Sequence, residues 1–118
     1  MGAETMKNFT KLERSVMAWM AENLDIPNLK DNIMAAVVTD RKNTGIGVIT
    51  SLSVPSDLSH INCSSPIIGP IIEADGIENG GTTKLLLDDS GHIVELEMLA
   101  CGESFAESIT SFKLSGWD

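Results

Sequence analysis

The stretch TTKLLLDDSGHIVELEMLA, residues 82 to 100, predicts the centre of the fold. Two runs rich in aliphatic residues flank the four residues DDSG, whose types favour a tight turn. Strands joined by such a turn pair as an antiparallel β-hairpin. We therefore expect residues 82–87 and 92–100 to be neighbouring strands of one sheet.

The second of these strands has two different faces, because side chains alternate sides along a strand. The face expected to meet the core is wholly apolar and comprises Val94, Leu96, Met98 and Ala100. The opposite face mixes aliphatic, thiol and carboxylate side chains: Ile93, Glu95, Glu97, Leu99 and Cys101. Like charges two residues apart repel, so we expect a cation near the glutamates, supplied by Lys84, Arg41 or Lys113.

The rest of the chain predicts one helix followed by further strands. TKLE, residues 10–13, is a capping box, and an apolar stripe follows at Leu12, Val16, Met20 and Leu24. The helix is expected to end near residue 25, because the proline at 27 disfavours helical backbone before it. Further strands are expected at residues 33–40, 46–54, 70–77 and 108–114; the first two form a hairpin, and the third lies at a sheet edge.

These elements define an α+β fold, in which an N-terminal amphipathic helix packs on one face of a mainly antiparallel sheet of four to six strands. The length of 118 residues fits a single domain spanning residues 1–118. We expect residues 1–7 to form a flexible leader.

Charge and composition narrow the class of partner. Eight lysines and arginines against seventeen aspartates and glutamates give a net charge of −9. Such a charge disfavours nucleic acid and anionic lipid and favours a basic protein partner. We expect no membrane association, since no stretch approaches the roughly 20 apolar residues of a spanning helix. In the absence of a signal-peptide pattern, Cys63 and Cys101 are expected to be reduced thiols in the cytoplasm.

Motifs for catalysis, metals and cofactors are incomplete. GIGVIT, from Gly45, has Thr50 in place of the third glycine of a dinucleotide-binding loop. GESFA, from Gly102, is similar to a nucleophile elbow, but no histidine follows Ser104. HINC, residues 60–63, offers two metal ligands without partners visible in the sequence. We accordingly expect no catalytic residues, no metal and no cofactor.

Two stretches together resemble a family of small bacterial domains found in accessory or mobile gene contexts. TDRKNTGIGVITSLSVPSD, residues 39–57, is similar to a pattern of Arg, then Thr-Gly-x-Gly, then a strand ending in Val-Pro. Residues 80–105 are similar to a hairpin whose second strand carries Gly-x-hydrophobic-x-x-Leu-Glu and then Gly-Glu. The matching positions are Arg41, Gly45, Gly47, Gly91, Leu96, Glu97 and Gly102.

Some domains of this kind look like immunity or toxin-neutralising proteins. The resemblance implies the fold, leaves the activity open and directs attention to Glu97 before Glu95. This chain departs from the pattern after Leu-Glu, where Met98 replaces an aromatic residue.

Three functions remain open. The first, which we favour, is a non-enzymatic binding module that receives a basic protein on the mixed sheet face. The second is a small-molecule site or enzyme in a pocket between the sheet and residues 55–81, where Arg41 anchors an anion and a glutamate acts as acid or base. The third is a structural homo-oligomer, such as a homodimer. The candidate binding residues are Glu95, Glu97, Arg41, Ile93 and Leu99.

Overall fold

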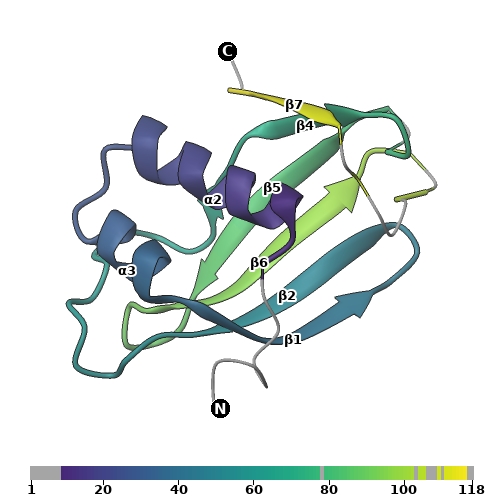
Figure 1. The fold of residues 1–118 in the computed structure, drawn as a ribbon. Helices are drawn as coiled ribbons and strands as arrows, with labels where there is room; N and C mark the ends of the chain where they lie inside the picture. The colour runs from purple at the N-terminus through teal and green to yellow at the C-terminus, as the bar shows by residue number, and fades with distance from the viewer. Residues whose placement is uncertain (1–8, 78, 103, 106–108, 110, 117–118) are drawn as a thin grey trace.

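The computed structural model describes residues 9–77, 79–102, 104, 105, 109 and 111–116. It confirms the α+β class: two helices lie on one face of a seven-stranded sheet whose paired strands are all antiparallel (Figure 1). The expected leader, residues 1–7, lies outside the described residues.

Helix α2, Lys11–Asn23, begins at the predicted capping box. The Thr10 hydroxyl accepts a hydrogen bond from the backbone N–H of Glu13 at 3.1 Å, and Glu13 Oε1 accepts one from the backbone N–H of Thr10 at 2.8 Å. These two bonds satisfy amides that the first turn leaves without helical partners. The predicted stripe packs on the sheet, where the buried members are Leu12, Val16 and Met20.

Helix α3, Leu29–Ala35, occupies part of a segment that the sequence predicted as a strand. Residues 33–35 form its last turn, and strand β1 starts only at Val37. A short apolar run does not distinguish a buried strand from a helical turn by its periodicity. The prediction was therefore wrong for the first four residues of the 33–40 segment.

Seven strands form the sheet: β1 (Val37–Asn43), β2 (Gly47–Ser53), β3 (Ile67–Ile68), β4 (Ile71–Ala74), β5 (Gly81–Leu87), β6 (Ile93–Ala100) and β7 (Phe112–Ser115). Their order is β1-β2-β6-β5-β4-β7, and β3 also pairs with β5. Both predicted hairpins, β1–β2 and β5–β6, are confirmed. The sheet exceeds the predicted number by the short strand β3, and β4 is not an edge strand because β7 pairs with its far side.

A β-bulge lies at the start of β6. Leu87 pairs with Ile93, whereas Leu86 pairs with Glu95, so Val94 is an extra residue. Such an insertion reverses the direction of the side chains on one side of it. Ile93 is therefore 1% exposed and Val94 39% exposed. The predicted faces were wrong for these two residues, whereas Leu96 and Met98 are buried as predicted.

A buried asparagine joins α3 to the sheet and to the loop that follows β2. The Asn32 side-chain amide donates to the carbonyl oxygens of Asn28 and Ser59, each at 3.0 Å. Its Oδ1 accepts a hydrogen bond from the backbone N–H of Ile93 at 3.3 Å. These bonds hold the loop against the helical side of the molecule.

The core lies between α2 and the inner face of the central strands, where Leu85, Leu96 and Met98 are buried. None of the helices in the described part of the chain has the length and apolar composition that crossing a bilayer requires.

Candidate functional site

The central strands present a second face, turned away from the helices, which we call the outer face. Both helices pack on the other side, so no helix of the described chain lies on it (Figure 1). Neighbouring side chains of β2, β6 and β5 form its centre: Ile49, Ser51, Glu95, Glu97, Leu99, Thr82, Lys84 and Leu86. These side chains are all partly exposed.

Glu97 has a cationic neighbour on the outer face. It pairs with Ile49 of β2 on one side and with Lys84 of β5 on the other. The Lys84 Nζ lies 3.6 Å from Glu97 Oε1. Lys84 is thus one of the three cations that the sequence predicted near the glutamates.

Glu95 has a different environment. It lies between Ser51 of β2 and Leu86 of β5, and among the described residues no lysine or arginine nitrogen comes within 4.0 Å of its carboxylate. Partial burial raises the pKa of Glu95, and the hydrogen bond and negative charge of Glu97 raise it further. The outer face therefore holds a carboxylate whose negative charge is not balanced by a described cation at ion-pair distance.

Leu99 extends the outer face at the end of β6. It is paired with Gly47 of β2, and a Cβ atom added to Gly47 would come within 2.5 Å of Leu99 Cδ2. The second glycine of the Thr-Gly-x-Gly stretch thus provides the space that the Leu99 side chain fills. This role is steric and requires no phosphate or nucleotide.

The structure brings three of the five predicted binding residues together on the outer face: Glu95, Glu97 and Leu99. Ile93 does not belong to it, because the bulge turns this side chain into the core. Arg41 does not belong to it either. Its partner in β2 is Thr50, a buried residue of the helical side.

Arg41 pairs with the capping-box glutamate of α2. Its Nε donates to Glu13 Oε2 at 2.7 Å and its Nη2 to Glu13 Oε1 at 2.6 Å. The Thr50 hydroxyl donates to Glu13 Oε2 at 2.6 Å, and the side chain of Glu13 is fully buried. Together with the Thr10 amide, these donors satisfy both carboxylate oxygens.

The charge state of Glu13 follows from this geometry. Burial raises the pKa of the Glu13 carboxyl, but hydrogen bonds from Arg41, Thr50 and Thr10 and the charge of Arg41 outweigh it, so the pKa is lowered overall. The hydrogen bond to Glu13 raises the pKa of Arg41. The pair is therefore ionised at neutral pH and fixes α2 to β1 and β2.

The second functional hypothesis places a pocket between the sheet and residues 55–81. Such a pocket would need Arg41 and a desolvated Glu95 or Glu97 in one cleft. The structure places Arg41 and these glutamates on opposite faces of the sheet. The first part of the 55–81 segment lies beside α3 instead, since Asn32 binds the Ser59 carbonyl. The later part forms β3 and β4.

Several outer-face residues were not singled out from the sequence. Ser51 of β2 and Leu86 of β5 flank Glu95, and Ile49 of β2 flanks Glu97. The alternation within residues 46–54 assigns odd positions to this face, so their direction could be predicted. Which glutamate each of them adjoins depends on strand order and register, and local sequence patterns do not predict these.

The outer face combines aliphatic side chains, two hydroxyls and charges of both signs. Within the described residues, no three histidine, cysteine, aspartate or glutamate side chains are close enough to hold a metal ion.

Comparisons with protein-family models, curated proteins and solved structures each find no match to this chain.

Proposed function

We propose that this protein is a non-enzymatic binding module that receives a basic protein on the outer face. The observation that carries the proposal is the environment of Glu95. A carboxylate beside a second carboxylate, without a described cation at ion-pair distance, is a site that an incoming lysine or arginine would stabilise.

The residues around Glu95 fit such a contact. Leu86 and Ile49 supply apolar surface that a partner would remove from water, and Ser51 supplies a hydroxyl that can donate or accept a hydrogen bond. Apolar surroundings also lower the local dielectric constant, which strengthens the attraction between a bound cation and the carboxylates. The contact thus combines a charged centre with an apolar surround.

Long-range electrostatics favours the same class of partner. The net charge of −9 accelerates encounter with a positively charged protein and slows encounter with an acidic one. Salt screens this field over about 8–10 Å at ionic strengths near physiological, so association is expected to weaken as salt is added.

An immunity-type inhibitor of a basic toxin is the concrete form of this proposal. It rests on the resemblance of residues 39–57 and 80–105 to small bacterial domains of that kind. We place the module in the cytoplasm, and the free thiols of Cys63 and Cys101, both exposed, are compatible with a reducing compartment.

The proposal is tested by capturing partners from a lysate of the source cells at low and moderate salt. The baits are the wild-type protein, the double variant Glu95→Lys/Glu97→Lys and the control Asp25→Lys/Asp57→Lys. Asp25 and Asp57 are exposed and lie outside the strands, so the control changes the net charge equally without altering the outer face.

We expect wild type and control to retain the same basic protein in stoichiometric amount, and the Glu95→Lys/Glu97→Lys variant to lose at least ~100-fold in affinity for it. Equal loss in both variants would show that general acidity is responsible. Retention by all three baits would show that the partner binds elsewhere. Either result contradicts the proposal.

A further inference from the structure

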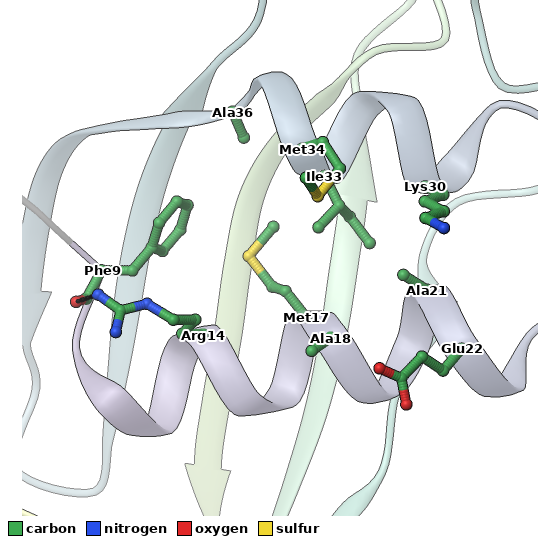
Figure 2. A pocket seen from close by; sticks show the side chains of 10 residues that line it. All are labelled: Phe9, Arg14, Met17, Ala18, Ala21, Glu22, Lys30, Ile33, Met34 and Ala36. Carbon is green, nitrogen blue, oxygen red and sulfur yellow. Dashed lines mark hydrogen bonds between the residues drawn. The ribbon is translucent and has the colours of Figure 1, made fainter.

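The helical layer carries a separate feature, an apolar groove between α2 and α3 (Figure 2). It has a volume of about 350 Å³. Its apolar lining includes Phe9, Met17, Ala18, Ala21, Ile33 and Met34. Because the sheet lies behind the helices, this groove and the outer face are on opposite sides of the molecule (Figure 1).

The groove exists because small side chains of α2 oppose larger side chains of α3. Ala18 and Ala21 leave space that a leucine would fill, and Met34 is 77% exposed along the opposite wall. Exposed apolar surface gathered into one concave feature is characteristic of a ligand site. Methionine side chains adapt to ligands of varied shape, which suits such a wall.

Charge is distributed unevenly along the groove. Figure 2 shows Arg14 at the end formed by Phe9, whereas Glu22 and Lys30 both lie at the opposite end. An acid and a base together give that opposite end no net charge. The Arg14 end is cationic, although the whole chain carries a net charge of −9.

Arg14 retains donors for a ligand. Its Nη2 donates to the Phe9 carbonyl oxygen at 3.3 Å. In the described part of the chain no carboxylate oxygen lies within 4.0 Å of its guanidinium. A guanidinium has five N–H donors in a planar arrangement that matches a carboxylate.

We propose that the groove binds a small amphiphile with an apolar chain and a carboxylate head, the chain lying along Met17, Ala21 and Met34 and the head at Arg14. A volume of about 350 Å³ lies at the lower end of the range of small-molecule sites, about 300–1,000 Å³. Decanoate, a single alkyl chain with one carboxylate, is a suitable probe.

The first test is titration of the full chain with decanoate, 1-decanol or decyltrimethylammonium, each kept below the concentration at which it forms micelles. Methionine methyl groups report the location by NMR, because Met17 and Met34 line the groove whereas Met98 lies in the core between strands. We expect decanoate to shift the Met17 and Met34 signals and leave that of Met98 unchanged. Decanol should bind several-fold more weakly, and the cationic amphiphile weakest of all.

Two variants test the assigned residues. Arg14→Gln should weaken decanoate binding about fivefold and leave decanol binding unchanged, whereas Lys42→Gln, a matched charge change on the exposed surface of β1, should alter neither. Ala21→Leu should reduce binding of both probes by filling the groove. If Ala21→Leu fails to fold, Ala18→Leu replaces it.

Equal affinity for the three head groups, a shift confined to Met98, or an unaltered affinity in Arg14→Gln would overturn the proposal. Binding that appears only after residues 1–8 are removed would also overturn it, because the chain itself would then occupy the groove. The Glu95→Lys/Glu97→Lys variant should bind decanoate like wild type, so this result stands or falls independently of the proposed protein partner.

Discussion

The Arg41 guanidinium binds the Glu13 carboxylate through two hydrogen bonds, at 2.6 and 2.7 Å, and thereby links strand β1 to the first turn of helix α2. Glu13 also closes the capping box with Thr10 and accepts a hydrogen bond from Thr50. One buried side chain therefore caps the N-terminus of a helix and fixes that helix to two strands.

Removal of Arg41 should strongly destabilise the fold. Arg41→Ala leaves the Glu13 carboxylate buried without its counter-charge, for which we expect a loss of about 3–5 kcal/mol in the free energy of unfolding. Arg41→Lys should lose less, because an ammonium retains the charge but not the paired geometry. Urea denaturation measures both, with the exposed Arg14→Ala as control, expected to change stability by less than about 0.5 kcal/mol. A loss below about 1 kcal/mol for Arg41→Ala would contradict this role.

The same pair predicts how stability depends on pH. The pKa of Glu13 is lower in the folded chain than the ordinary value of 4.5, so its ionised form stabilises the fold above that value. This contribution is lost as the pH falls from about 4.5 through the folded pKa. Denaturation midpoints between pH 7 and pH 3 should therefore decline more steeply for wild type than for Glu13→Gln. Parallel declines would show that Glu13 does not cause the acid sensitivity.

Asn32 is expected to be a second structural determinant. Asn32→Ala leaves the Ser59 carbonyl and the Ile93 N–H without this partner in a buried setting, which should cost about 2–4 kcal/mol of stability. Asn62→Ala provides a matched control, because Asn62 is exposed. Thermal unfolding gives the melting temperatures of the two variants for comparison. Similar melting temperatures would mean that water replaces the lost bonds without cost.

Neutralising Glu95 should have the opposite effect on stability. Its pKa is raised in the folded chain, so ionisation destabilises the fold as the pH rises through that pKa. Glu95→Gln removes both the desolvation cost and the repulsion from Glu97, and should stabilise the protein by a few tenths of a kcal/mol at pH 7. This gain in stability should disappear at acidic pH, where Glu95 of the wild type is protonated. If Glu95→Gln destabilises the protein at pH 7 while the exposed control Asp89→Asn does not, the Glu95 carboxylate makes a stabilising contact and this prediction is wrong.

Much of the fold follows from local sequence patterns. The capping box, the apolar stripe of α2 and the two hairpins each depend on residues close together in the chain, and all four are present. The bulge at Val94 is different, because it is stabilised by a side chain from a distant helix. Asn32 accepts the N–H of Ile93, an interaction over 61 residues that no local pattern reveals.

The candidate site was predictable to the same extent. Alternation along β6 placed Glu95, Glu97 and Leu99 on one face, and charge repulsion predicted a cation that proved to be Lys84. Arg41 was expected near this face as another of the three possible cations, and the strand predicted before it covered only residues 33–40. In the structure β1 continues through Arg41, which points toward Glu13 on the helical side.

Photo-crosslinking in the source cells shows directly whether a basic protein docks on Glu95 and Glu97. A photoreactive amino acid replaces Ser51, which adjoins Glu95 on the outer face, or Ser15, a serine of α2 that is also partly buried. We predict a covalent adduct with a basic protein from position 51, none from position 15, and loss of the adduct when Glu95→Lys/Glu97→Lys is added. No adduct at position 51, or one that persists after the charge reversal, would contradict a partner docked on these glutamates.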